Sequence, residues 1–405
     1  LTTYQGFVDS NAEFGNSNVD INSQSGTMGN IEICHGDFNV SSASTLTSSV
    51  NQLTLTNSFS VPTGDTDSRI HCHTAGSIRF NEDLGTLEFY TGDMWKTVNS
   101  FKDTGNRGRA VFTTNAGGNK LDFVNIPTLG NATTFGALGN GNRHYGCASE
   151  TRGLWAGGYN PNNTNVIEYI TIASEGDAID FGDLTESRRA LAAASSSTRG
   201  VWGGGYAPTG GGAPNRTNNI QYVEIQTLGN TSDFGDLATA TVSNAACASP
   251  TRCIFSGGYT SPFQYEVITT ASTGNATRFG DMLVPMARHG GCSNSTRGVF
   301  GSGRHVNPYA GGSVGITTEL EHITIASEGN ATFFGNLTVK RNMLAAASNQ
   351  TRGLFAGGYA SPVNYNIIDY ITFSSAGNAI DFGDCIEEKR GTSGLSDSHG
   401  GLGGY

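Results

Sequence analysis

The sequence predicts an all-β protein, most of which consists of about six repeats of a four-stranded unit. Two short motifs recur along the chain, and 57 of its 405 residues are glycine. Charged residues make up only 14%, whereas Gly, Ser, Thr and Asn are abundant, a mixture typical of short strands joined by tight turns. No stretch keeps a helical period for more than a turn or two, which argues against a helical fold.

The first motif is a nonapeptide in which an apolar run leads, in most copies, to a pair of glycines. It reads TRGLWAGGY from Thr151, TRGVWGGGY from Thr198, TRCIFSGGY from Thr251, TRGVFGSGR from Thr296 and TRGLFAGGY from Thr351. The pattern predicts a strand whose glycines let a neighbouring backbone approach closely. The arginine column of the motif is predicted to brace neighbouring units by hydrogen bonds to carbonyls, and it comprises Arg152, Arg199, Arg252, Arg297 and Arg352.

The second motif, exemplified by GNATTFGAL, occurs six times between copies of the first. Its phenylalanines lie 46, 53, 45, 55 and 48 residues apart, at Phe135, Phe181, Phe234, Phe279, Phe334 and Phe382. A period in this range indicates the blades of a propeller or the units of a solenoid. Four asparagines of the motif sit in glycosylation sequons, which we attribute to turn geometry because they occupy the same turn of each repeat: Asn131, Asn230, Asn275 and Asn330.

Each repeat contains four candidate strands. A small-residue strand such as Arg188–Ser196 is followed by the nonapeptide, by an alternating β-branched strand such as Val166–Ile172, and by the phenylalanine motif. Three cysteines, Cys147, Cys247 and Cys292, occupy a slot of the small-residue strand that also accepts alanine, so this slot is predicted to be buried. A four-stranded unit repeated about six times predicts a β-propeller.

The propeller is expected to close through the two ends of residues 106–405. Residues 108–138 supply the later strands of a first blade, and the tail from Lys389 to Tyr405 is predicted to supply its first two strands. Closure of this kind removes exposed sheet edges. The segments GRAVF, from Gly108, and GGLGGY, near the C-terminus, compete for one place, and we favour the tail.

The order of these strands and the double glycine after an apolar run resemble the kelch repeat. The resemblance covers residues 108–405, although phenylalanine stands where kelch repeats carry tryptophan near the last strand. It implies a kelch-like β-propeller and says nothing of function, because one fold hosts many activities.

Residues 1–105 do not repeat and are predicted to form a small β-rich N-terminal domain. The segment Gly76–Val98, GSIRFNEDLGTLEFYTGDMWKTV, predicts a hairpin around NEDLG and then an aromatic strand that ends on Trp95. It resembles a short module of bacteriophage tail-fibre and other virion proteins, and the repeats look like those of structural proteins of cyanophages. The resemblance implies a virion protein (tail fibre, knob or decoration), made in the host cytoplasm and displayed on the particle. Residues 1–105 would then contact other virion proteins or form a homo-oligomer, with a trimer favoured.

Nearly all length variation between repeats falls between the second and third strands. In an up-and-down blade these loops emerge on one face, together with the links between blades, and variable loops on a rigid scaffold commonly form binding surfaces. We therefore predict host-surface attachment, to a glycan or a protein, by this loop face; the alternative is that loops merely tolerate insertions. The candidate ligand-binding residues are Asn162, Arg216, Tyr265, His305, Tyr309 and Tyr365.

One candidate metal site lies in the N-terminal region. His71 and His73 would point to the same side of a strand, and three such pairs around a three-fold axis could bind iron, as the resemblance to trimeric phage fibres implies. The alternative is two packed or solvated histidines. No other cofactor is expected.

Several functions are disfavoured by the sequence. A net charge of −11 disfavours nucleic acid as a partner, and no apolar run is long enough to cross a membrane. Seven cysteines without a C-x-x-C pair exclude a complete disulfide framework and favour a reducing folding compartment. No catalytic set of residues recurs at a plausible spacing. We therefore expect a non-enzymatic protein; the alternatives are a secreted cellular adhesin or lectin and, less favoured, a kelch-type copper radical oxidase.

Overall fold

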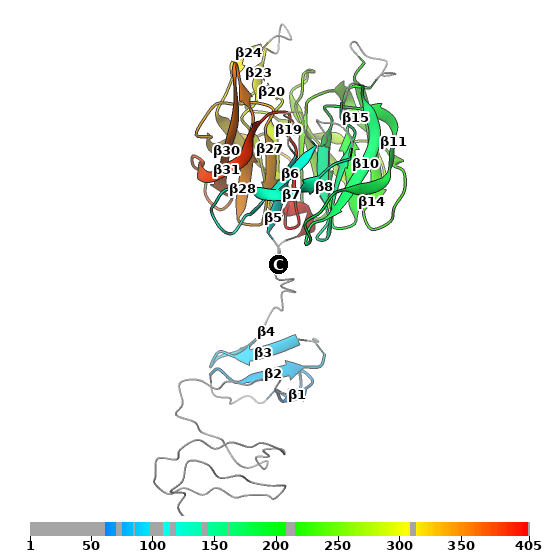
Figure 1. Cartoon of the computed structure of the whole chain (residues 1–405). Helices are drawn as coiled ribbons and strands as arrows, with labels where there is room; N and C mark the ends of the chain where they lie inside the picture. The colour runs from blue at the N-terminus through cyan, green and yellow to red at the C-terminus, as the bar shows by residue number, and fades with distance from the viewer. Residues whose placement is uncertain are drawn as a thin grey trace, which may run out of the picture. The chain divides into compact units, whose positions relative to one another are not determined.

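The computed structural model describes residues 61–69, 75–83, 86–97, 108–113, 119–139, 145–159, 162–207, 215–307 and 313–403 (Figure 1). In these ranges the protein is all-β apart from a single 3-10 turn, η1 (Gly400–Leu402), so the predicted fold class is confirmed at this level. The chain divides into two compact units, Leu1–Asn99 and Ser100–Tyr405. The boundary predicted after residue 105 falls outside the described residues. None of the described residues belongs to a helix that could span a membrane.

The N-terminal unit contains one four-stranded sheet. Its strands lie in the order β1 (Thr63–Gly64), β2 (Ile78–Asn81), β3 (Thr86–Tyr90) and β4 (Trp95–Thr97). The predicted hairpin is confirmed, since β2 pairs with β3 in antiparallel fashion. Trp95, which was predicted to end an aromatic strand, instead begins β4 and lies opposite Tyr90 of β3.

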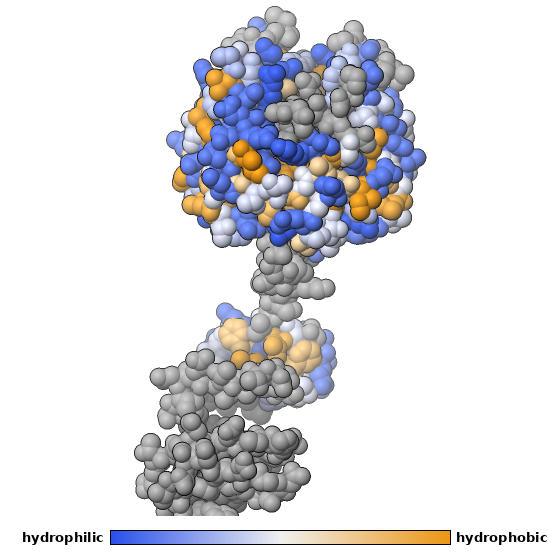
Figure 2. Space-filling model, viewed as in Figure 1, coloured by the Kyte–Doolittle hydropathy of each residue, from blue (hydrophilic) through white to orange (hydrophobic). Residues whose placement is uncertain are grey.

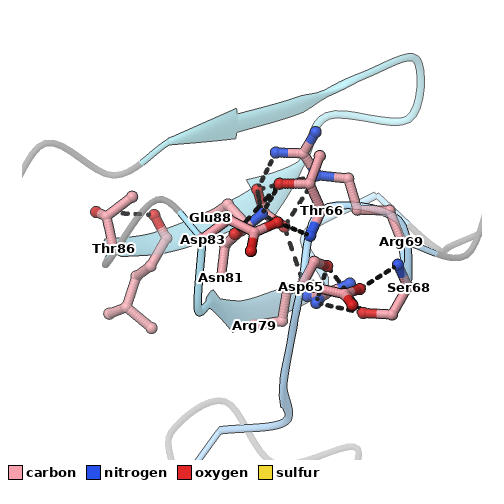
Figure 3. A network of polar contacts seen from close by, with 10 residues as sticks. Asp65, Thr66, Ser68, Arg69, Arg79, Asn81, Asp83, Thr86 and Glu88 are labelled. Carbon is pink, nitrogen blue, oxygen red and sulfur yellow. Dashed lines mark hydrogen bonds and ion pairs between the residues drawn. The ribbon is translucent and has the colours of Figure 1, made fainter.

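A buried carboxylate organises this sheet (Figure 3). Glu88 of β3 is fully buried, and the guanidinium of Arg69 donates to it over 2.5 Å while Arg79 lies 3.5 Å away. Arg79 also donates to the carbonyl of Asp65. The bond from Arg69 lowers the pKa of Glu88. An isolated buried charge would be costly, so Glu88 requires a positively charged partner. Arg69, which lies in the segment that follows β1, is that partner, and their ion pair holds this segment against the sheet.

The larger unit repeats one kind of antiparallel four-stranded sheet, with neighbouring strands consecutive along the chain apart from short insertions. The strands of five sheets are β8 (Tyr145–Ala148), β9 (Arg152–Ala156), β10 (Thr164–Thr171) and β11 (Ile179–Arg188); β12 (Ala192–Ser195), β13 (Arg199–Gly203), β14 (Thr217–Glu224) and β15 (Ser232–Thr241); β16 (Ala245–Ala248), β17 (Arg252–Ser256), β18 (Gln264–Thr269) and β19 (Thr277–Asp281); β21 (Gly290–Ser293), β22 (Arg297–Gly301), β25 (Glu319–Thr324) and β26 (Thr332–Asn336); β27 (Ala345–Ser348), β28 (Arg352–Ala356), β30 (Val363–Thr372) and β31 (Ile380–Lys389).

Two insertions extend these sheets. The short strand β29 (Tyr359–Ala360) pairs with the start of β30. A separate three-stranded sheet consists of β20 (Met286–Ala287), β23 (Arg304–Val306) and β24 (Ser313–Ile316). Strands β23, β24 and β29 lie between the second and third strands of a repeat, where the sequence varies most in length, whereas β20 comes directly before a first strand.

The two ends of the larger unit share a sixth sheet of this kind. The C-terminal strand β32 (Gly394–Ser396) pairs with β5 (Arg109–Thr113), which is followed by β6 (Lys120–Asn125) and β7 (Thr133–Ala137). The tail therefore pairs with the first repeat, as predicted, but it supplies one strand rather than two. GRAVF takes the second place because Val111 and Phe112 bury large apolar side chains, whereas GGLGGY contributes η1.

Contacts between sheets follow the chain and then return to their starting point. The first strands contact one another in the order β32, β8, β12, β16, β21, β27, and β27 contacts β32 again. The phenylalanine motifs repeat this order: a Cβ on Gly280 would collide with the carbonyl oxygen of Gly329, and one on Gly383 with that of Gly130. The last motif thus touches the first.

The hydrophobic core lies between neighbouring sheets. Trp155 and Trp202 are buried there, and the phenylalanine in each of the six phenylalanine motifs is at most 3% exposed. Cys147, Cys247 and Cys292 are also buried, which confirms the predicted small, buried slot. Burial raises the pKa of another core thiol, Cys253, to about 12, so it has no thiolate character at neutral pH.

The arginine column braces neighbouring sheets, as predicted. Arg252 donates from Nη1 over 3.1 Å to the carbonyls of Ile325 and Ala326, and Arg352 donates to those of Ile126 and Pro127. The other members are Arg152, Arg199 and Arg297, each of which reaches a carbonyl of a neighbouring sheet, and Arg109 of β5 does the same.

The sequon asparagines have a further role that turn geometry alone does not explain. The Oδ1 atom of Asn275 accepts a 3.0 Å hydrogen bond from the backbone N–H of Asp236 in the preceding sheet. Asn131, Asn230 and Asn330 accept equivalent bonds, and Asp177 replaces the asparagine in one repeat. The asparagine of this motif therefore forms a hydrogen bond between neighbouring sheets, in addition to its place in a turn.

Candidate functional site

Five connections between sheets run side by side and place a left-handed residue at equivalent positions. These residues are Ala190, Ser243, Arg288, Met343 and Gly391, with φ of 55°, 61°, 57°, 58° and 65° respectively. The backbone N–H of each donates over 2.7–2.8 Å to the carbonyl of the one before it, from Ser243 through to Gly391. The connections are thereby fixed by hydrogen bonds and do not depend on side-chain packing alone.

A cavity of about 260 Å³ opens between these connections. Arg189, Arg288 and His289 line it together with Tyr206 and Tyr259, and no carboxylate belongs to its described lining. Tyr206 and Tyr259 end copies of the nonapeptide, directly before the variable segments. The cavity and these segments therefore belong to the same face of the unit.

Three buried polar atoms in the cavity wall have no hydrogen-bond partner among the described residues. They are Asn244 Oδ1, His289 Nδ1 and Thr392 Oγ1, and their residues are 6%, 6% and 7% exposed. The hydroxyl of Tyr259 in the same wall is likewise unpartnered within that part of the chain. Because buried polar groups are nearly always hydrogen-bonded, this concentration in one cavity points to a polar occupant.

Stacked tyrosines hold the arginines of this face. The guanidinium of Arg189 lies 4.5 Å from the ring centroid of Tyr159 and 4.6 Å from that of Tyr206, and Arg288 lies 5.5 Å from Tyr259. Neither arginine forms an ion pair with a carboxylate of the described residues. The two positive charges are therefore positioned without being neutralised.

His289 is a neutral imidazole in this wall. Its Nε2 lies 2.7 Å from the hydroxyl of Ser256, and burial lowers its pKa to about 3. Its remaining nitrogen can thus donate or accept a hydrogen bond according to tautomer. No carboxylate that would orient the ring in a catalytic triad is bonded to it in the described part of the chain.

The opposite end of the inner strands is closed by the tail. His399 lies 3.2 Å from the hydroxyl of Ser195, and its Nδ1 accepts from the N–H of Gly401. This places the ring proton on Nε2, which donates to the carbonyl of Ala148 over 2.8 Å. With Nδ1 occupied and Nε2 protonated, His399 has no free lone pair with which to activate the serine.

The structure contradicts one predicted binding residue. Tyr265 was expected to bind ligand at the loop face, yet it lies in β18, is completely buried, and donates from its hydroxyl to Glu321. The third strand of this repeat, β18, begins at Gln264, one residue before Tyr265. Tyr265 pairs with Ser256 as Ile167 pairs with Ala156, so the two residues occupy equivalent positions in their repeats.

The other described candidates lie outside the lining of the cavity. Asn162 is exposed, Arg216 donates to the carbonyl of Tyr259 and to Thr260, and His305 lies half-buried in β23. Tyr365 lies half-buried in β30, and Tyr309 falls outside the described residues. None of the five described candidates lines the cavity.

The cavity residues were missed because they lie in connections, not in the variable segments. The available signal was the arginine in RRAL and ARHG, which comes shortly before the small-residue strands β12 and β21. The proposed iron ligands His71 and His73 lie outside the described residues, and among the residues that are described no cluster of three His, Cys, Asp or Glu could hold a metal.

On the larger unit, the view of Figure 2 shows no continuous apolar patch. Large exposed apolar residues such as Leu129, Ile179 and Leu228 are spread over different repeats, and orange residues are scattered among blue ones on the visible face. No protein-family model matches the sequence, and no curated protein matches it.

Proposed function

We propose that the larger unit is a six-bladed, kelch-like β-propeller and that the protein is a non-enzymatic attachment protein that binds a surface ligand with one end of it. Six sheets of the same kind, contacts that run in chain order from β32 to β27, and the return from β27 to β32 support the closed propeller. The hydrogen bond from Arg352 to the carbonyl of Ile126 joins the last sheet to the first, as the equivalent arginines join consecutive sheets.

The observation that carries the binding function is the cavity at the centre of the connections. It combines unpartnered buried polar atoms with stacked arginines, and it opens on the face that bears the segments of variable length. A rigid scaffold with such a face is the usual arrangement of a binding protein. Within the described part of the chain, the two serine–histidine pairs have no carboxylate partner of the kind that a catalytic triad requires, which favours binding over catalysis.

The setting of this function is also part of the proposal. We infer a phage virion appendage, with residues 1–105 attached to other virion proteins and a trimer favoured, on the resemblance of Gly76–Val98 and of the repeats to phage proteins. Iron at His71 and His73 belongs to the trimeric form of this proposal. A secreted adhesin or lectin is the second candidate, because the same face would serve it equally well.

The test is binding of the labelled full-length protein to an array of bacterial surface polysaccharides and to intact bacteria. In one variant, residues 207–219 are shortened to the length of 260–264; in another, Glu387→Ala changes a remote exposed residue as a control. We expect specific binding that the shortened variant alters and the control does not. Absence of binding to every surface, or identical binding by both variants, would contradict attachment through this face.

A further inference from the structure

We propose that the cavity between the connections binds an acidic sugar, with the carboxylate held by Arg288 and Arg189 and the hydroxyls held by Asn244, His289 and Thr392. This inference rests on the proposed attachment function and names the ligand class. It would make the terminal residue of an acidic glycan the recognised group.

The charge of the cavity differs from that of the whole chain. The chain carries a net charge of −11, yet the described lining contains two arginines and no carboxylate. An arginine without a carboxylate partner is a strong donor to a ligand carboxylate, because its planar fork can form two parallel hydrogen bonds. The cavity therefore selects for an anion against the field of the surrounding protein.

The unpartnered atoms indicate a polyhydroxylated ligand rather than a simple anion. Asn244 Oδ1 can only accept a hydrogen bond, whereas the hydroxyls of Thr392 and Tyr259 can donate or accept. An inorganic anion without a hydroxyl, such as sulfate, offers no donor to Asn244, but a sugar hydroxyl offers both roles.

The size of the cavity sets the length of the ligand. At about 260 Å³ it lies just below the range of roughly 300–1,000 Å³ typical of sites for drug-sized molecules. It therefore accommodates one sugar ring rather than an oligosaccharide, and the rest of a glycan would extend past the variable segments.

Arg288 and Arg390 provide a matched pair of variants. Each stacks on a tyrosine of its repeat, Tyr259 and Tyr359 respectively, but only Arg288 lines the cavity. We expect Arg288→Gln to weaken binding of glucuronic acid or N-acetylneuraminic acid to the full-length protein by about tenfold or more, measured by titration calorimetry. Arg390→Gln, which removes the same charge, should change it less than about twofold.

Tyr259→Phe and Thr392→Val separate ligand binding from stability. Both remove hydroxyls that bond nothing in the described chain, so we expect weaker sugar binding with unchanged or higher melting temperature. Tyr222→Phe, at the Arg199 stack on another part of the unit, is the control. Lower stability with unchanged binding would overturn the proposal, because the hydroxyls would then be structural.

The choice of titrants distinguishes the ligand classes. Binding of acidic sugars, with weaker binding of glucose and of acetate, supports the proposal. Equal binding of glucose, or of acetate alone, would overturn it. Array binding to neutral glycans that Arg288→Gln leaves unchanged would overturn this ligand class and leave the attachment function intact, whereas calorimetric binding of acidic sugars without surface binding would contradict the attachment function instead.

Discussion

The hydroxyl of Tyr265 donates a 2.5 Å hydrogen bond to Oε1 of Glu321, which joins β18 of one sheet to β25 of the next. The other oxygen of Glu321 accepts from the backbone N–H of Val284 over 3.0 Å. This carboxylate belongs to a buried column on the third strands, whose other members are Asp122, Glu168, Gln221, Glu266 and Asp369. Most of them accept a backbone N–H of the preceding sheet.

The burial of Glu321 makes stability dependent on pH. Burial is the main cause that raises the pKa of Glu321 from 4.5 to about 7. The folded protein therefore binds this proton more tightly than the unfolded chain, and the free energy of unfolding falls as pH rises from about 4.5 to about 7. The contribution is fully present below the lower value and lost above the higher one.

Glu321→Gln should remove this pH dependence. Gln221 occupies the same place in another repeat and accepts from the N–H of Thr185, so the amide is compatible with the fold. We expect the variant to be more stable than the parent at about pH 8, by up to about 3 kcal/mol, with little difference at about pH 4. Denaturant titrations at both pH values test this, and an unchanged slope with pH in the variant would contradict it.

Asp397→Ala should weaken the closure between the two ends of the larger unit. Oδ1 of this buried aspartate accepts from the N–H groups of Gly108 and Arg109 over 2.7 and 3.1 Å. Losing the acceptor leaves buried donors unpaired, which costs about 2–3 kcal/mol. Chemical denaturation measures the loss.

Glu387→Ala is the control for that experiment. The exposed ion pair of Glu387 with Lys120 also joins the last sheet to the first, but exposed pairs contribute less than about 1 kcal/mol. If both variants lose the same stability, the closure does not depend on Asp397.

The arginine braces should contribute similarly at the closure and elsewhere. Arg352 joins the last sheet to the first and Arg252 joins two consecutive ones, each through two carbonyls. We expect Arg352→Met and Arg252→Met each to lower the free energy of unfolding by about 1–3 kcal/mol. Arg278→Met, which removes an exposed ion pair with Asp281, should change it little. A harmless Arg352→Met would argue against closure at that junction.

Repetition made the scaffold predictable from the sequence. Arg252 and its counterparts recur at the same position of each nonapeptide, and a side chain kept in every repeat must meet the same neighbour in each, so its bracing role could be inferred. The buried slot of Cys147 followed from its exchange with alanine. Tyr265 directly follows the variable segment 260–264, but its side chain points to the buried side of β18, so its assignment to the loop face was wrong.

The cavity could not be predicted in the same way. Its wall combines Arg189, Asn244, Arg288 and Thr392, which come from four connections far apart in the sequence. They meet only because left-handed residues such as Ser243, which is not glycine, align these connections by backbone hydrogen bonds. The local sequence around a residue that is not glycine does not predict a left-handed conformation.

Gly280→Ala and Gly329→Ala test the contact between phenylalanine motifs from its two sides. A Cβ on Gly280 would collide with the carbonyl oxygen of Gly329, a backbone atom that cannot rotate away, whereas a Cβ on Gly329 would meet nothing within 4 Å. Neither glycine has the left-handed φ that would itself penalise alanine. We expect Gly280→Ala to lower the free energy of unfolding by about 1–3 kcal/mol.

The partner variant should behave differently because the contact is one-sided. Gly329→Ala gains no clash and loses chain entropy only in the unfolded state, so it should be neutral or slightly stabilising. Urea denaturation followed by circular dichroism measures both. Equal losses of stability in the two variants would contradict this explanation. Glycine would then be required at both positions for the local backbone conformation, and not because neighbouring sheets approach closely.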